Sequence, residues 1–248
     1  MTDPVRVDTR DGVLSITLDR PEKKNALTGA MYRALTAALG RAGEDPSVGA
    51  VLIKGAPGAF TAGNDLKDFV AAAESGEGLT SIVAFLRALA TAEVPLVAAV
   101  DGLAIGVGTT LLMHCDLVFA SDRSVFRTPF TDLGLVPEAA SSLIGPRLMG
   151  HQRAFELLVA GLAFDAERAA AAGLVNRVLP AERVAEEAFA AAAALAAKPR
   201  RAVAISRRLL KGDPLEILAR IDEEALLFAE RLRSAEAQAA FRAFLTRG

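Results

Sequence analysis

Apolar and polar residues alternate near the start of the chain in a pattern that predicts strands before the first helix. Residues 5–10 and 13–18 have strand patterns on either side of an Asp-Gly turn. After a polar loop, residues 28–43 show the spacing of an amphipathic helix, with Thr28 placed as its N-cap. The apolar segment 50–54 has the length of a buried strand and is followed by a Gly- and Pro-rich turn.

The middle of the chain repeats this alternation of strand and helix patterns. Helical spacing covers 80–92, a strand pattern covers 96–100, a helix introduced by two glycines covers 106–114, and a further strand covers 117–120. Alternation of this kind is typical of parallel strands joined by helical crossovers, so the chain is predicted to be an α/β protein. The small, polar segment 69–78 predicts a mobile loop or a frayed helix.

Helical patterns dominate from residue 152 onward. They include 166–172 and 181–197, and residues 200–244 predict two or three amphipathic helices. We therefore divide the chain into a core domain at 1–197, which holds the active site, and a helical oligomerisation region at 198–248. The apolar positions of this last region exceed what a peripheral helix pair needs, and they are Leu209, Leu210, Leu215, Leu218, Leu226, Leu227, Phe228 and Phe241.

Composition narrows the class of protein. With 248 residues, 52% hydrophobic content and a net charge of -2, the chain can build a large core and has no overall attraction to nucleic acid. The single cysteine, Cys115, fits a reducing compartment and a buried structural thiol. No signal peptide or membrane span is recognised, so a cytoplasmic protein is predicted. The basic residues near the C-terminus predict a solvated helix face, and they are Arg200, Arg201, Arg207, Arg208 and Lys211.

The chemistry centres on one carboxylate, Glu138, which follows a proline among small apolar residues. A carboxylate in such surroundings tends to have a raised pKa and can move a proton near neutral pH. Two glycine-containing segments upstream, 60–65 and 102–108, could bring backbone N–H groups to an anionic oxygen. A base beside such an oxyanion hole is suited to proton abstraction next to a thioester carbonyl. A structural alternative for Glu138 is a helix N-terminal acid.

Four segments resemble the enoyl-CoA hydratase/isomerase (crotonase) family, and in the family's order they are 20–27, 60–66, 102–116 and 172–178. Each motif alone is weak, but the four together are specific. The resemblance covers nearly the whole chain and implies a crotonase-like spiral of ββα turns followed by a C-terminal helical trimerisation region. It also implies acyl-CoA substrates, with coenzyme A present only as part of the substrate and no separate cofactor.

The carboxylates distinguish branches of this family. Hydratases use two glutamates, and alignment places Thr110 and Phe130 at those two positions, so ordinary hydration is not expected. Glu138 instead matches the single catalytic glutamate of the peroxisomal-type Δ3,Δ2-enoyl-CoA isomerases, with Thr-Pro-Phe before it and a Ser-Ser pair after it. The resemblance therefore implies an isomerase that shifts a 3-enoyl-CoA double bond to the 2-position with one proton-shuttling residue.

The resemblance also assigns roles to particular residues. Glu138 is the expected base, and the Ala62 and Val107 amides are the expected oxyanion hole. Asn64 could order a water, and Asp65 could cap a helix or fix the loop of the hole. The two histidines lack metal-ligand spacing, so no metal is expected. The expected substrate contacts are Lys23, Lys24, Ala26, Ala62, Asn64, Asp65, Leu66, Gly106 and Phe130.

Other functions remain open from the sequence. One alternative is a different crotonase chemistry at the same hole, such as hydration, thioester hydrolysis or dienoyl isomerisation. Another is a non-catalytic or RNA-associated member, which would call for a lysine-rich helix face that this chain lacks. The homo-oligomer could be a trimer or a dimer of trimers. No nucleic acid or membrane partner is expected.

Overall fold

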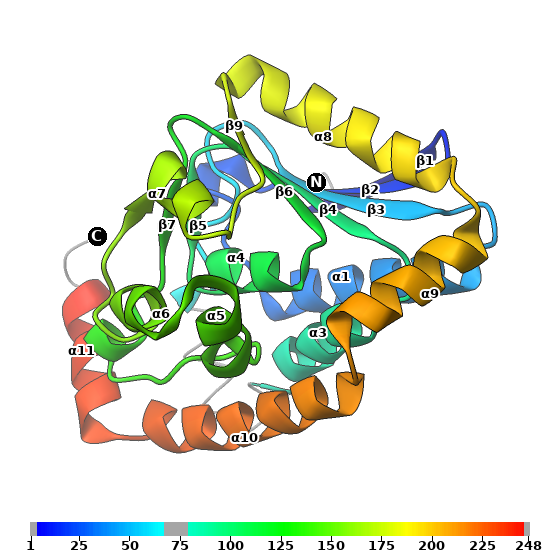
Figure 1. Cartoon of the computed structure of the whole chain (residues 1–248). Coiled ribbons are helices and arrows are strands. Elements are labelled where there is room, and N and C mark those ends of the chain that lie inside the picture. The colour runs from blue at the N-terminus through cyan, green and yellow to red at the C-terminus, as the bar shows by residue number, and fades with distance from the viewer. Residues whose placement is uncertain (1–3, 67–78, 246–248) are drawn as a thin grey trace.

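The structure is a computed structural model that describes residues 4–66 and 79–245. Within these residues the larger sheet has six strands in the order β1-β2-β3-β4-β6-β9 (Figure 1). β1 and β2 are antiparallel, and each later pair of neighbours is parallel, as the alternating pattern predicted. The strands are β1 (Val5–Arg10), β2 (Val13–Leu18), β3 (Ala50–Gly55), β4 (Leu96–Val100), β6 (Leu117–Ser121) and β9 (Arg177–Leu179).

A smaller sheet contains β5 (Leu103–Ile105), β7 (Val125–Arg127) and β8 (Phe164–Asp165), none of which was predicted. β4 leads into β5 and then a helix, and β6 leads into β7 and then further helices. Each such turn places its first strand in the larger sheet and its second strand in the smaller one. This is the spiral of ββα turns that the resemblance implies.

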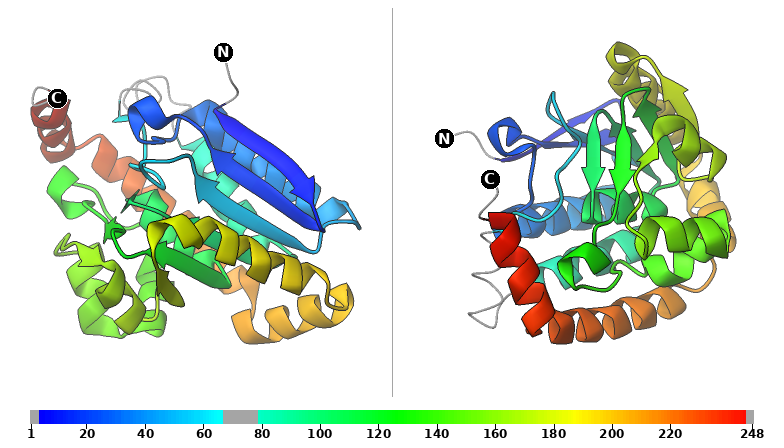
Figure 2. Two further views of the ribbon diagram at one scale, coloured as in Figure 1. Left: turned by 90° about the horizontal axis from the view of Figure 1, so that it is seen from above. Right: turned by 90° about the vertical axis from the view of Figure 1, so that its left-hand side faces the viewer.

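Helices cover both faces of the larger sheet. α1 (Gly29–Glu44) and α3 (Thr80–Thr91) lie on one face, and α8 (Ala181–Ala196) crosses the other (Figures 1 and 2). All six residues of β2 are buried, as is expected of a strand covered on both sides. Small residues such as Ala188 and Ala192 let α8 approach the strands closely.

Local signals position α1 as predicted. The Thr28 side chain accepts a hydrogen bond from Met31 N, which satisfies one amide of the first turn. The apolar face of the helix buries Met31, Tyr32 and Leu35 against the sheet. Tyr32 thereby reaches the segment that follows β3, where its hydroxyl contacts Asn64.

The other helices that precede α8 in the described chain are short. The helix predicted at 106–114 consists of one α-helical turn followed by a 3-10 turn, and Gly106 precedes it with a positive φ of 56°. The predicted segment 69–78 lies outside the described residues. The remaining helices are η1 (Pro21–Lys23), α4 (Val107–Thr110), η2 (Leu111–His114), η3 (Thr131–Leu133), α5 (Ser141–Met149), α6 (His151–Leu158) and α7 (Ala166–Ala171).

The C-terminal region forms α9 (Arg200–Lys211), α10 (Pro214–Leu232) and α11 (Ala235–Leu245). α10 runs beneath α3 and α5 (Figure 1), and α11 packs beside η3. Phe228 and Phe241, predicted to serve oligomerisation, are buried within this chain. None of the described helices is both long and apolar enough to cross a membrane.

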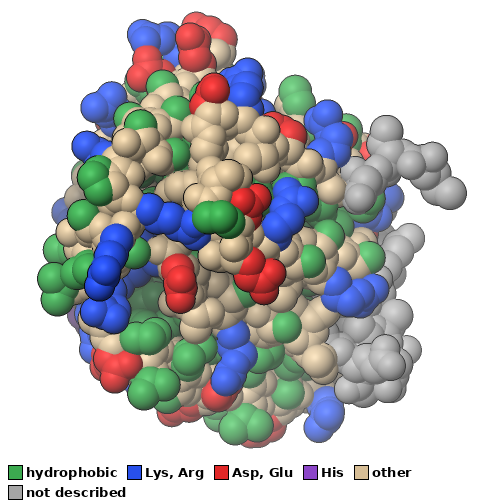
Figure 3. Space-filling view, turned by 90° about the vertical axis from the view of Figure 1, so that its right-hand side faces the viewer, with side chains coloured by type: hydrophobic (Ala, Val, Ile, Leu, Met, Phe, Trp, Pro, Cys, Tyr) green, Lys and Arg blue, Asp and Glu red, His purple; other side chains and the backbone are tan. Residues whose placement is uncertain are grey.

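The predicted basic helix face is only partly exposed. The side chain of Arg207 is 11% exposed, and its Nε donates a 2.7 Å hydrogen bond to Asp116 Oδ2. Lys211 donates to the carbonyl of His114, and Arg200 donates to that of Asp45. The prediction of a solvated face is therefore wrong for these three cations, which anchor α9 to the core, whereas Arg201 and Arg208 are exposed. On the side shown in Figure 3, basic and acidic side chains are interspersed.

Candidate active site

Glu138 lies in the loop between η3 and α5, and its side chain is only 8% exposed. Its Oε1 accepts a hydrogen bond from the Thr110 hydroxyl. Its Oε2 is buried and has no partner among the described residues. The pKa of Glu138 is raised to about 8, because burial and, to a smaller extent, the nearby charge of Glu224 raise it while the Thr110 hydrogen bond lowers it. The predicted acid is thus held by one oxygen and free at the other.

The backbone after Glu138 adopts an uncommon conformation. Ala139 and Ala140 both have left-handed φ values, 65° and 53°, which residues with a Cβ rarely adopt. His114 Nε2 lies 2.7 Å from Ala139 O. Burial lowers the pKa of His114 to about 4, so the ring is neutral near pH 7 and can donate that proton as the Nε2–H tautomer. Surrounding contacts therefore hold the loop that presents Glu138.

The two predicted oxyanion segments lie side by side. Thr61 N donates to Leu103 O at 2.9 Å, and Ile105 N donates back to Thr61 O at 3.0 Å. Gly63 is required here, because it has a φ of +86° and a Cβ would lie 2.8 Å from Ile105 O. Val107 N begins α4, where the first amides have no intrahelical acceptor, and none of the described residues accepts its hydrogen.

The prediction that the Ala62 amide faces a ligand is wrong. Ala62 N donates to Lys24 O at 2.9 Å, so this amide is already paired within the chain. Leu27 N donates to Gly63 O and Asp65 N donates to Leu27 O, both at 2.8 Å. Since amides alternate in direction along such an extended pairing, the Asn64 N–H points away from this partner. No described residue accepts it, so the Asn64 amide, and not that of Ala62, is the candidate second donor of the site.

A cavity of about 570 Å³ joins these groups, and we refer to it as the main cavity. Lys24 is the one predicted substrate contact that does not line it, because its backbone is turned to a left-handed φ of 51° and its carbonyl is paired with Ala62. The predicted residues that do line it are Lys23, Ala26, Ala62, Asn64, Asp65, Leu66, Gly106, Val107, Phe130 and Glu138.

Sequence reasoning missed several cavity residues. Arg20 lines the main cavity and donates a 2.7 Å charged hydrogen bond to Asp65 Oδ2, which fixes the loop as expected of Asp65. Phe228 and Phe241 also line it, so the C-terminal helices form one wall of the site. Their place in the apolar pattern was visible, but nothing in the sequence indicated that they fold back onto their own chain.

Tyr32 and Asn64 form a second polar contact beside the acid. The Tyr32 hydroxyl donates to Asn64 Oδ1 at 2.5 Å. Burial and the nearby charge of Glu138 raise the pKa of Tyr32 well above its ordinary value, so the phenol stays protonated. The contact orients the Asn64 side chain. The role of Asn64 in ordering a water stays a prediction.

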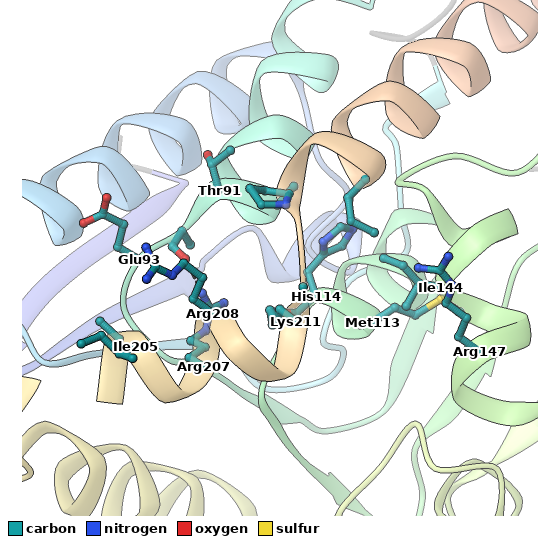
Figure 4. A pocket seen from close by; sticks show the side chains of 16 residues that line it. Thr91, Glu93, Met113, His114, Ile144, Arg147, Ile205, Arg207, Arg208 and Lys211 are labelled. Carbon is teal, nitrogen blue, oxygen red and sulfur yellow. Dashed lines mark hydrogen bonds between the residues drawn. The ribbon is translucent and has the colours of Figure 1, made fainter. Parts of the chain in front are cut away.

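A second cavity, of about 520 Å³, lies between α9, α3 and α5, away from Glu138. Figure 4 shows Arg207, Arg208 and Lys211 on one side of it and Ile144 and Arg147 on the other. Its cations are largely engaged, since Arg207 pairs with an aspartate, Lys211 with a carbonyl and Arg147 with a glutamate.

Neither the thiol nor a metal group offers an alternative centre in the described chain. Burial raises the pKa of Cys115 to about 12, which disfavours the nucleophilic thiolate, as predicted. Within residues 4–66 and 79–245, no three His, Cys, Asp or Glu side chains gather as a metal-binding group. Asp116 and Asp132 form ion pairs with Arg207 and Arg127.

Comparisons with known proteins agree on one family. The family model for enoyl-CoA hydratase/isomerase matches residues 8–248. Enoyl-CoA delta isomerase 2 of Rattus norvegicus is 36% identical over 98% of this chain, and the chain spans 63% of that protein's length. A probable enoyl-CoA hydratase of Rhizobium meliloti is 37% identical over 77% of this chain and 74% of its own length.

The fold comparison gives the same result. The crystal structure of an enoyl-CoA hydratase/isomerase from Pseudoalteromonas atlantica superposes with a TM-score of 0.94. It is 42% identical to this chain, and the match covers 99% of this chain and 98% of the other. The ββα spiral and the C-terminal helices are therefore shared with a solved structure over essentially the whole length.

Proposed function

The chain belongs to the enoyl-CoA hydratase/isomerase family, and from this premise we propose that it converts 3-enoyl-CoA thioesters to 2-enoyl-CoA thioesters. The observation that carries the proposal is the Glu138 carboxylate, which lines the main cavity with one oxygen unpaired within the described chain. Its pKa of about 8 suits a group that both takes and returns a proton near neutral pH. The isomerase relative supports the same reaction.

The proposed reaction needs one base and one oxyanion hole. The amides of Asn64 and Val107 donate to the thioester oxygen. The ionised Glu138 removes a proton from C2, and the electrons of that C–H bond pass into a dienolate whose charge rests on this oxygen. Glu138 then returns the proton to C4 as the double bond forms between C2 and C3. No water or redox partner is consumed.

The same geometry fits hydration less well. Hydration requires two groups that hold and activate a water, whereas Thr110 and Phe130 occupy the positions of the two hydratase acids. Thr110 is fully buried with its hydroxyl engaged by Glu138, and Phe130 presents an apolar ring to the main cavity. Asp65, the other acid that lines this cavity, is paired with Arg20.

Coenzyme A is proposed to enter only as part of the substrate. Lys23 lines the main cavity, where its positive charge favours the phosphates of a nucleotide, and Arg20 lines the same cavity with its guanidinium paired to Asp65. Lys24 is not included among the proposed phosphate contacts, because it does not line the main cavity and its carbonyl accepts a hydrogen bond from Ala62 N.

We also propose that the chain assembles as a homotrimer or a dimer of trimers through its C-terminal region. Leu209 and Leu210 are 76% and 89% exposed, and leaving such large apolar side chains in contact with water is unfavourable. Leu215 and Leu226 add 67% and 75% exposed side chains on α10. These four leucines define the exposed leucine surface.

The proposed function is tested by offering 3-enoyl-CoA and 2-enoyl-CoA separately to the pure protein in an absorbance assay. Isomerisation of the first substrate is expected, without appreciable hydration of the second. Hydration within an order of magnitude of isomerisation would overturn the proposal, because another pair of groups would then have to handle water.

A further inference from the structure

The buried face of α10 contains a carboxylate among apolar residues. Ile221, Glu224, Phe228 and Leu232 share this face at helical spacing, and Glu224 is only 5% exposed. A carboxylate at such a position is unfavourable unless hydrogen bonds compensate for its lost hydration. Glu224 is therefore not explained by the packing of the helix alone.

Three donors surround the Glu224 carboxylate, and all of them come from the segment that follows Glu138. Glu224 Oε2 accepts from Ala140 N at 2.6 Å. Glu224 Oε1 accepts from Ser142 N at 3.0 Å and from Ser142 Oγ at 2.5 Å. Both oxygens are thus bound to the end of the Glu138 loop and the first turn of α5, more than 80 residues away in the sequence.

This loop is the one with the unfavourable backbone. Ala139 and Ala140 follow Glu138 directly and are both left-handed, which persists only where the surroundings determine it. His114 contacts the carbonyl of Ala139, and Glu224 binds the amide of Ala140. These are the two polar atoms of one peptide group, the one that joins Ala139 to Ala140, so contacts from two different elements fix its orientation next to Glu138.

We propose that Glu224 is a positioning residue that holds the Glu138 loop in its reactive geometry, so that α10 is coupled to proton transfer. This inference rests on the function proposed above. α10 also carries Phe228, which lines the main cavity one turn beyond Glu224. The same helix therefore closes the cavity and orients its base.

The charge of Glu224 acts on the same base. Its carboxylate raises the pKa of Glu138, and the groups facing Glu138 from other elements are the Tyr32 phenol and the Thr110 hydroxyl. On the far side of Glu224, Arg220 Nη1 donates to Ser142 Oγ at 3.0 Å. The neutral His114 ring adds no charge near pH 7. Removing the charge of Glu224 should therefore lower the pKa of Glu138.

The test compares Glu224→Gln with Glu230→Gln, which removes the same charge from an exposed position of the same helix. Glu224→Gln keeps the side-chain length but replaces one acceptor by a donor. We expect kcat for 3-enoyl-CoA to fall by on the order of 10- to 100-fold, with KM changed by less than about threefold. The pH at which kcat/KM is half-maximal should move to lower pH. Glu230→Gln should match the parent in all three quantities.

A parent-like kcat and pH profile for Glu224→Gln would overturn the inference. If that variant does not fold by circular dichroism, Ser142→Ala removes one of the three contacts, the hydroxyl donor, while leaving α10 unchanged, and a lowered kcat is again expected. A parent-like kcat for a folded Ser142→Ala would then count against it.

If the proposed function is wrong, the parent protein will not turn over 3-enoyl-CoA, and this outcome is distinct from failure of the inference about Glu224. The inference is then tested by ¹³C NMR titration of the Glu138 carboxyl, whose resonance is assigned with Glu138→Gln. A lower pKa of Glu138 in Glu224→Gln than in the parent supports the inference. An unchanged pKa overturns it whatever reaction the site performs.

Discussion

The Thr110 hydroxyl donates a hydrogen bond to the carboxylate of Glu138, and both side chains are buried. Thr110 occupies the position where the hydratase pattern places its first glutamate. The hydroxyl therefore supports the remaining acid instead of supplying a second one. Because this bond stabilises the ionised form, it lowers the pKa of Glu138 against the effect of burial.

Thr110→Val is expected to slow isomerisation at neutral pH. Valine keeps the shape of the side chain but removes the donor to Glu138, so the pKa of Glu138 should rise above about 8. At pH 7 the ionised fraction falls by about tenfold for each unit of pKa rise, and kcat/KM should fall with it. The rising limb of the pH profile should move to higher pH. A limb at the parent position would contradict a role of this hydrogen bond in setting the pKa.

Val107→Pro tests the oxyanion hole with little disturbance of the fold. Val107 is the first residue of α4, where proline is tolerated because the missing amide has no helical partner. Loss of one oxyanion donor typically lowers the rate by about 10²–10³-fold. Val107→Ala keeps the amide and is the matched control, expected within a few-fold of the parent. Equal turnover in the folded proline and alanine variants would remove Val107 from the hole.

The periodicity of hydrophobic residues was sufficient to predict most of the longer strands and helices of this fold. The pattern of six alternating residues predicts β1 and β2, and Thr28 predicts the start of α1. β7 and β8 span three and two residues, too few for any period to emerge. These short strands exist because neighbouring turns of the spiral bring them together, which is information that a local pattern does not contain.

The candidate site was predictable to the level of segments but not of individual amides. Gly63 indicated a turn of the backbone. Which amide faces the cavity depends on the hydrogen bonds to Lys24 and Leu27, which no local pattern shows. These bonds engage the N–H of Ala62 and leave that of Asn64 without an acceptor among the described residues. Glu224 shows the same limit. It stands out as an acid on an apolar helix face, but its partners lie in a distant loop.

The exposed leucine surface should mediate assembly. The parent is expected to have at least trimeric mass in light scattering at micromolar concentration, because these leucines are otherwise left in water. Leu210→Glu should lower that mass, since it places a charge at the most exposed of them, which is 89% exposed in the isolated chain. Leu162→Glu, at an exposed position outside the C-terminal helices, is the control. A monomeric parent would contradict the proposed assembly.

Glu138→Gln separates a catalytic role from a structural one. Glutamine keeps the shape of the side chain but cannot accept the C2 proton, so turnover should fall by about 10²–10⁴-fold or more while the fold persists.

The free energy of unfolding of Glu138→Gln gives an independent readout. The pKa of Glu138 rises from 4.5 to about 8 on folding, so the folded state binds its proton more tightly than the unfolded state does. Ionisation therefore costs stability progressively as the pH rises from about 4.5 to about 8. At about 1.4 kcal/mol per pKa unit, the cost amounts to a few kcal/mol. The variant should consequently gain stability relative to the parent across this window and keep that gain at higher pH. Denaturant unfolding at pH 5 and pH 9, run beside the turnover assay, checks both expectations. A helix-capping glutamate would give the opposite pattern, with lowered stability and near-parent turnover.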